Sequence, residues 1–382
     1  MHSVNRKPDN NFMTDKNPFP IIVDAHLDMA YNVLNKHRDY RRAAHATREL
    51  ERGTAVEKQS GACTVGLPDL IRGRVGLVFA TIFTEPARHK ISDDLPVYHN
   101  AEEAHTLGMQ QLDFYRRWAD EDDHVMLVTN QQELATVTSG WGLGISPAPE
   151  KPEAVESHKV GLVMLMEGAD PILEPKELER WVEMGLRIVG PAWDTTRYCG
   201  GTWQGGRLPK LGHELLDMIA QLGVVLDVSH MSHESLYEAL DIFQGRHIIA
   251  SHSNAHHYLP TARHLPDKAI EMLAERNGVI GVVPYNRFLK KDWSGKKDDV
   301  TLDDVIRMID HICQLTGNAD HVAIGSDFDG GLGYNEIPRE LDTVRDHYKI
   351  GNELLQRGYA PAHVDQIMYG NWLRVLRDAL PN

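Results

Sequence analysis

The sequence is poor in cysteine and has no long hydrophobic run. Its 382 residues contain three cysteines, Cys63, Cys199 and Cys313, which are far apart and form no Cys-x-x-Cys pair. This pattern favours a reducing compartment over a disulfide scaffold. No run of about 18 apolar residues is present, and the polar first twenty residues lack the apolar core of a signal peptide. We therefore expect a cytoplasmic protein without a membrane anchor.

Positive charge is also scarce in this chain. It has 40 Lys and Arg residues against 55 Asp and Glu residues, a formal net charge of -15. Nucleic-acid-binding surfaces are basic, and the chain has no basic cluster, so we expect no nucleic-acid partner. With 42% hydrophobic and 25% charged residues, the composition is that of a soluble globular enzyme.

The chain reads as one elaborated domain behind a short polar segment. Residues 1–19 are predicted to be a flexible N-terminal segment, and residues 20–382 contain no linker long or biased enough to mark a domain boundary. A single α/β barrel with insertions reaches this length. The charged stretch 33–60 reads as an insertion rather than core. Residues 139–152, rich in Gly and Pro, are predicted to be a loop.

Apolar segments of strand length alternate with helical segments along the chain. The expected strands are 20–28, 75–83, 160–167, 186–193, 224–230, 247–252, 279–284 and 321–327. The expected helices include 100–120, 175–185, 210–222, 266–278, 301–316 and 363–376, with Ser232 and Thr301 as N-caps. A shorter segment, 125–129, reads as an extra strand. This alternation predicts an α/β fold, a (β/α)8 TIM barrel.

Several of the expected strands end in residues that bind metals. The endings are His26 and Asp28, then Glu167, His230, His252 and Asp327. His26 and Asp28 are two residues apart and so project to the same side of their strand. The carboxyl ends of all barrel strands meet at one face, where active sites lie. The sequence therefore predicts that these six side chains converge.

Each of these residues also has an ordinary structural explanation. A histidine at a strand end can be a structural residue, Glu167 can cap a turn, and Asp327 can belong to a turn with Asp329 and Gly330. Six such endings in one chain favour a metal site. Imidazoles and carboxylates without thiolates suit catalytic zinc or a similar divalent ion. Five ligands can hold two ions if one carboxylate bridges them, and Glu167 is the expected bridge.

Short motifs across the chain resemble the membrane dipeptidase (renal dipeptidase) family of zinc peptidases, which is related to the amidohydrolase superfamily. The matching segments are 24–28, 67–68 with Gly76, 167–168, 226–230, 251–255, 325–330 and 370–375. They run nearly end to end and are very specific in combination. The chain is identified as a soluble, bacterial-type member of this family.

The resemblance implies a role for each candidate site residue. His26 and Asp28 would bind one zinc ion, His230 and His252 the other, and Glu167 would bridge the two. Arg263 matches the arginine that binds the substrate carboxylate, and Asp327 matches the aspartate that transfers the proton. Other divalent ions can replace zinc in such a site.

Trp193 marks a departure from the family pattern. In eukaryotic members the strand after the bridging Glu ends in a His that contacts the substrate, and Trp193 occupies that position here. An indole ring can pack on a substrate side chain, but its N–H is a single donor. Trp193 is therefore a candidate substrate-binding residue, and the substrate range depends on it.

The leading hypothesis is a dinuclear zinc dipeptidase. A metal-bridging hydroxide would attack the scissile carbonyl of a dipeptide, and Asp327 would pass the proton to the leaving amine. Another amide or lactone hydrolase on the same barrel is an alternative, because the fold does not determine the substrate. A metal-containing binding protein without turnover is a third, against which Asp327 argues. The oligomeric state is left open, with a homodimer as one candidate.

Overall fold

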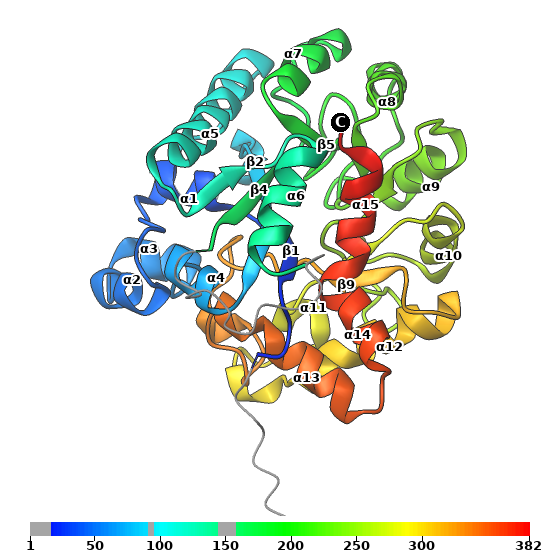
Figure 1. Ribbon diagram of the computed structural model, residues 1–382. Helices are drawn as coiled ribbons and strands as arrows, with labels where there is room; N and C mark the ends of the chain where they lie inside the picture. The colour runs from blue at the N-terminus through cyan, green and yellow to red at the C-terminus, as the bar shows by residue number, and fades with distance from the viewer. Residues whose placement is uncertain (1–16, 91–94, 144–157) are drawn as a thin grey trace, which may run out of the picture.

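The computed structural model describes residues 17–90, 95–143 and 158–382. Most of the predicted flexible segment 1–19 and of the predicted loop 139–152 lies outside the described residues. In Figure 1 the strands occupy the centre of the molecule and helices surround them. Among the described residues, no helix has both the length and the apolar composition needed to cross a membrane.

The strands match those predicted from the sequence. The described strands are β1 (Ile22–Leu27), β2 (Val75–Phe83), β3 (Val125–Leu127), β4 (Val160–Glu167), β5 (Leu186–Gly190), β6 (Val225–Asp227), β7 (Ile248–Ile249), β8 (Ile280–Val282) and β9 (Val322–Ile324). Those of the central sheet are parallel and almost wholly buried, which explains their unbroken apolar character. The extra strand predicted near 125–129 is β3.

The strands curl into a closed ring. Six of them pair in the order β1-β2-β4-β5-β6-β7, and β8 pairs with β9. A parallel bridge between Ala250 and Ile280 joins the two groups. The last strand returns to the first, where the Asp327 N–H donates to the His26 carbonyl oxygen at 3.2 Å. This closure confirms the predicted (β/α)8 barrel, with β3 attached outside the ring to the first half of β4.

A buried carboxylate reinforces the closure between the first and last strands. Asp24 on β1 accepts the backbone N–H of Ser326 at 2.7 Å and also the Ser326 hydroxyl. Asp24 Oδ1 also accepts the backbone N–H of His26 at 3.3 Å, and the Nε2 of His347 lies 2.9 Å from Asp24 Oδ2. Asp24 therefore holds together the two strands that carry His26 and Asp327.

The helices cover the outside of the barrel. They are α1 (Met29–Lys36), α2 (Ala44–Glu51), α3 (Ala55–Ser60), α4 (Leu67–Arg72), α5 (Ala101–Glu121), α6 (Gln131–Gly140), α7 (Leu178–Glu183), α8 (Lys210–Gln221), α9 (His233–Ile242), α10 (Asp267–Glu275), α11 (Asn286–Leu289), α12 (Leu302–Thr316), α13 (Tyr348–Gln356), α14 (Pro361–Asp365) and α15 (Asn371–Ala379). Ser232 and Thr301 cap α9 and α12, as predicted.

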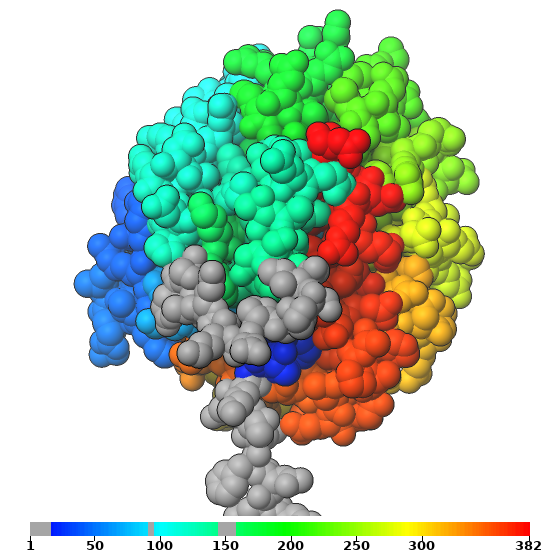
Figure 2. Space-filling view, in the orientation of Figure 1, coloured from blue at the N-terminus to red at the C-terminus, as the bar shows by residue number. Residues whose placement is uncertain are grey.

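The C-terminal helix packs against both the barrel and α6. The Trp372 N–H donates to the Ile324 carbonyl oxygen at 2.9 Å, and the indole ring packs on the ring of Phe79. Figure 2 shows the C-terminal residues, in red, beside the residues of α6. There the Gln131 N–H donates to the Pro381 carbonyl oxygen at 2.8 Å. The motif around Trp372 is thus explained by packing.

The prediction that residues 33–60 form a charged insertion outside the core was wrong in part. Arg38 is almost completely buried, with 1% of its surface exposed. Its Nη2 lies 3.0 Å from Glu51 Oε2, and its Nη1 lies 3.3 Å from Asp329 Oδ2. A guanidinium can be buried when carboxylates pair with it. The stretch is therefore attached to the barrel through the loop that follows β9.

Candidate metal centre

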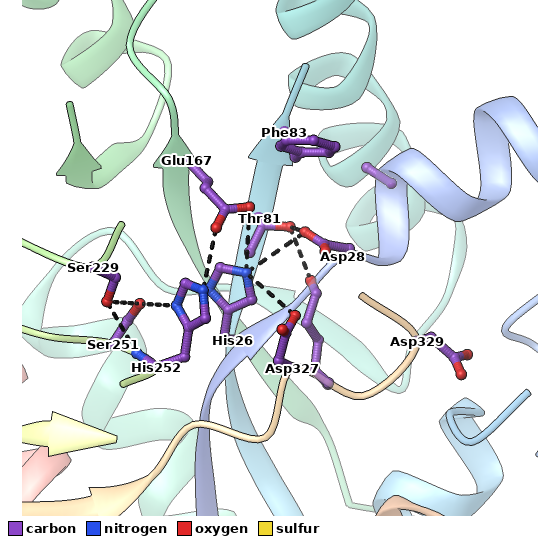
Figure 3. Close-up of polar contacts among 12 residues, drawn as sticks. His26, Asp28, Thr81, Phe83, Glu167, Ser229, Ser251, His252, Asp327 and Asp329 are labelled. Atoms are coloured by element: carbon purple, nitrogen blue, oxygen red, sulfur yellow. Dashed lines mark hydrogen bonds and ion pairs between the residues drawn. The ribbon is translucent and has the colours of Figure 1, made fainter. Parts of the chain in front are cut away.

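The predicted metal-binding side chains meet at the carboxyl ends of the strands. His26 is in β1, Glu167 is the last residue of β4, and His230 and His252 lie just beyond β6 and β7. Asp327 follows β9. Figure 3 shows Glu167, His26, His252 and Asp327 pointing toward one another. The structure thus brings together residues far apart in the sequence, as the barrel topology predicts.

His26 lies at the centre of a group of carboxylates. Its Nε2 is 3.6 Å from Glu167 Oε2, 3.7 Å from Asp28 Oδ1 and 3.9 Å from Asp327 Oδ1. Two ligands of one tetrahedral zinc ion lie roughly 3.4 Å apart, because each is about 2.1 Å from the metal. Within the described residues, the buried His26 Nε2 has no hydrogen-bond partner. A cation bound among these atoms would supply one, so the residues fit a metal ion.

The second oxygen of Glu167 faces two other histidines. Glu167 Oε1 is 3.2 Å from His230 Nε2 and 3.2 Å from His252 Nε2. These two nitrogens are 3.0 Å apart. One oxygen of Glu167 therefore faces His26, and the other faces the His230 and His252 pair. This is the arrangement expected of a carboxylate shared by two ions.

Hydroxyl groups orient the histidine pair. Thr202 Oγ1 lies 3.1 Å from His230 Nδ1, and Ser251 Oγ lies 2.8 Å from His252 Nδ1. The Ser251 hydroxyl in turn donates a hydrogen bond to Asp227 Oδ2 at 2.5 Å. Because each Nδ1 has a partner, each Nε2 is free to face Glu167. Thr202 was not among the site residues predicted from the sequence.

Another hydroxyl fixes Asp28. Thr81 donates a hydrogen bond to Asp28 Oδ1. Thr81 is a polar residue in the wholly buried strand β2, which is the signal in the sequence that could have identified it. Thr81 was not among the site residues predicted from the sequence.

The electrostatics of the group favour a bound cation. Burial by itself lowers the pKa of His26, but the carboxylates of Glu167, Asp28 and Asp327 outweigh burial and raise that pKa to about 10. Burial and the charges of Asp28 and Glu167 raise the pKa of Asp327 well above its usual range. The clustered negative charge thus attracts a positive one, which either a proton or a metal ion can supply.

Two residues of the site have strained backbones. His230 has φ 65° and Asp327 has φ 58°, in the left-handed region, which costs a non-glycine residue roughly 1–2 kcal/mol. Gly330 lies close to the carboxylates: a Cβ there would be 1.9 Å from Asp327 Oδ1 and 2.8 Å from Asp28 Oδ2. Only glycine fits at this position without displacing them.

We predict that Gly330→Ala weakens metal binding. The added methyl group must push aside two carboxylates of the metal centre, and disturbing the support of metal ligands typically weakens affinity about 10–100-fold. Competition with a chelator would measure the change. Gly140→Ala is the control, because a Cβ at Gly140 meets no atom of the described residues within 4 Å. Equal affinities of Gly330→Ala and the unsubstituted protein would contradict the prediction.

A cavity of about 300 Å³ opens onto the metal centre. Aromatic rings form one wall: the Trp193 ring centroid is 4.9 Å from that of Phe83, 4.7 Å from that of Trp203 and 6.3 Å from that of His230.

The predicted strand 186–193 ends early, at Gly190, before Pro191, which has no N–H to donate. Trp193 therefore lies in the loop and lines the cavity.

Arg263 contacts the backbone of His252. It is buried in the loop between β7 and α10, where its Nη1 donates to Ser253 Oγ at 2.9 Å and its Nη2 donates to the His252 carbonyl oxygen at 2.5 Å. Its Nε is buried and has no partner among the described residues. The guanidinium stacks near the ring of Phe288, which lines the cavity.

The chain is similar in sequence to known proteins. The family model for membrane dipeptidases, peptidase family M19, matches residues 18–380. The chain is 26% identical over 324 residues to dipeptidase tcpJ of Claviceps purpurea, covering 82% of this chain and 69% of that protein. It is 32% identical over 234 residues to an uncharacterised protein in the pqqA 5′ region of Klebsiella pneumoniae, covering 58% of this chain and 83% of that protein.

Solved structures show the same fold. A metallopeptidase from Rhodobacter sphaeroides, in complex with a phosphinate mimic of the dipeptide L-Ala-D-Ala, superposes with a TM-score of 0.73 at 22% identity, covering 94% of this chain and 99% of that one. The metallopeptidase dipeptidase AC superposes with a TM-score of 0.74 at 23% identity, covering 95% and 99%. Because the family model spans nearly the whole chain, this protein belongs to the membrane dipeptidase family of metallopeptidases, peptidase family M19.

Proposed function

We propose that this protein is a dinuclear metal-dependent dipeptidase, with zinc as the expected ion and other divalent ions as alternatives. The observation that carries the proposal is the position of Glu167, whose two oxygens face separate groups of ligands. His26 and Asp28 would hold one ion, and His230 and His252 the other. Glu167 would be the ligand common to both.

The residues around the metal centre suit hydrolysis of a small amide. Divalent ions held there would lower the pKa of bound water and polarise a carbonyl. Asp327 lies against His26 and lines the cavity, so its carboxylate can take up the proton of the attacking water and return it to the leaving amine. The rings of Trp193 and Phe83 cover one side of the cavity and limit the access of solvent water.

A dipeptide is the substrate that these features favour. Arg263 provides a guanidinium near the metal centre that can pair with the terminal carboxylate of a short peptide. The Claviceps relative is called a dipeptidase, and the Rhodobacter structure holds a dipeptide mimic. The cavity of about 300 Å³ is of a size for small ligands.

Metal analysis combined with a dipeptide panel tests this function. Protein purified without chelators should contain close to two divalent ions per chain and should hydrolyse free dipeptides. Activity should disappear with chelation and return with added zinc. A folded, chelator-free preparation with no bound metal would refute the proposal. Turnover of lactones or unrelated amides, with none of dipeptides, would favour a different hydrolase on the same barrel.

We predict that Arg263→Met selectively impairs turnover of free dipeptides. Loss of a charge-assisted pair with the substrate carboxylate should lower kcat/KM for a free dipeptide about 10–100-fold. The corresponding dipeptide amide has no carboxylate and should be affected far less. Arg263→Lys, which keeps the charge but not the planar fork, should be intermediate. Equal losses on both substrates would show that Arg263 does not recognise the carboxylate.

A further inference from the structure

Lys36 is a buried cation on the wall of the cavity. It is the last residue of α1, only 7% of its surface is exposed, and it lines the cavity together with Asp28 and Tyr31. Its Nζ lies 5.1 Å from the centroid of the Tyr31 ring. Lys36 belongs to the stretch 33–60, which was predicted from the sequence to be a charged insertion rather than core.

The ammonium group of Lys36 has an aromatic neighbour but no anionic one in contact. Within the described part of the chain, Nζ makes no hydrogen bond or ion pair, and the carboxylates of Asp28, Asp329 and Glu85 act on it only from beyond contact distance. Burying a charged group without a partner is costly. Burial, together with the charge of Arg38, accordingly lowers the pKa of Lys36 to about 8. The burial of the Lys36 ammonium group at this position therefore requires an explanation.

Neutralising the nearby carboxylates does not by itself explain why Lys36 is buried. Glu85 already accepts a hydrogen bond from the Tyr31 hydroxyl at 2.6 Å. Asp28 accepts from the Thr81 hydroxyl and faces His26, so it already has partners. Asp329 accepts from Thr64 through both its N–H and its hydroxyl, each at 2.7 Å. The position at the C-terminal end of α1 favours a positive charge, but an exposed side chain would satisfy the helix dipole equally well.

The location of Lys36 relative to Arg263 indicates which part of a substrate it would meet. Lys36 follows β1, and Arg263 follows β7, so the two cations come from different sides of the barrel mouth. The metal centre draws on the same two sides, with His26 in β1 and His252 just beyond β7. A dipeptide with its carboxylate at Arg263 and its scissile carbonyl at the metal centre would extend its amino-terminal residue toward Lys36.

We propose that Lys36 forms a subsite for an acidic side chain on the first residue of the dipeptide, so that the preferred substrates are Glu-X and Asp-X. This inference rests on the proposed function. The side-chain carboxylate of the substrate supplies the anionic partner that Lys36 otherwise lacks. The Tyr31 ring beside Nζ restricts where the ammonium can go and so favours a fixed ion pair.

Paired substrates that differ only in charge test the subsite. The kcat/KM for Glu-Ala should exceed that for Gln-Ala by about tenfold or more, whereas Ala-Glu and Ala-Gln should be similar. In Lys36→Met, which keeps the apolar stem, the Glu-Ala to Gln-Ala ratio should fall close to one. Lys36→Arg should restore much of the preference. These ratios compare two substrates of one enzyme, so a loss of stability does not change them.

Arg287→Met is the matched control. Arg287 also lines the cavity, but its side chain is 60% exposed and lies 3.8 Å from Glu336. Its replacement should leave the Glu-Ala to Gln-Ala ratio intact. An equal fall in Arg287→Met would attribute the preference to the overall positive field and overturn the assignment to Lys36.

Failure of the subsite and failure of the proposed function are distinguishable. An enzyme that hydrolyses neutral dipeptides but does not prefer Glu-Ala over Gln-Ala refutes the subsite alone. A preference found only at the second residue, or one that persists in Lys36→Met, also refutes it. If no dipeptide is hydrolysed by the metal-loaded protein, the proposed function fails, and the subsite fails with it.

Discussion

Glu167→Ala is expected to abolish the binding of both metal ions and therefore all measurable dipeptidase activity. One oxygen of Glu167 faces His26, and the other faces His230 and His252, so removing the carboxylate removes a ligand from each proposed site at once. It also leaves the three imidazoles without the charge that balances bound cations. Elemental analysis should show a fall from about two ions per chain to fewer than one.

The control for this experiment is Glu179→Ala, which removes an exposed carboxylate on α7. It should retain both ions. Far-UV circular dichroism of Glu167→Ala, compared with unsubstituted protein stripped of metal, separates loss of ligands from loss of fold. Retention of two tightly bound ions in Glu167→Ala would show that this carboxylate is not the bridge, and retention of one would assign it to a single site.

Asp327→Asn is expected to lower kcat by at least about 10²-fold while both ions stay bound, because general acid–base catalysis typically contributes about 10²–10⁴-fold. The amide has nearly the same size as the carboxylate but cannot take up the proton. Asparagine also tolerates the left-handed backbone that Asp327 adopts at φ 58°, so the loop should keep its shape. Steady-state kinetics together with metal analysis would measure both quantities.

The possible results for Asp327→Asn separate two roles of this carboxylate. Loss of metal would identify Asp327 as a ligand, a role that its distance of 3.9 Å from His26 Nε2 permits, and would require another proton carrier. A nearly normal kcat would refute the proposed proton transfer. Asp329→Asn is not a suitable control, because Asp329 holds Thr64 and Arg38 in place.

The barrel was predictable because its signals are local. Each buried parallel strand is a short apolar run, and each run can be recognised without knowing its neighbours. Once eight strands alternate with helices, topology alone places His26, Glu167 and His252 at one face, since the carboxyl ends of the strands share it. The same reasoning could not extend to Trp193, because the early end of β5 at Gly190 depends on pairing with β4 and on Pro191.

The sequence by itself determined the succession of short apolar runs that form the barrel strands, and that several of these runs end in a His, Asp or Glu residue. Only the tertiary structure decided which oxygen of Glu167 faces which histidine, and that Gly330 must leave room for two carboxylates. It also decided that Lys36 and Arg38 are buried, although their local sequence is charged and polar. The burial of Arg38 depends on a partner from a distant segment, Asp329, and no local pattern encodes such a pairing.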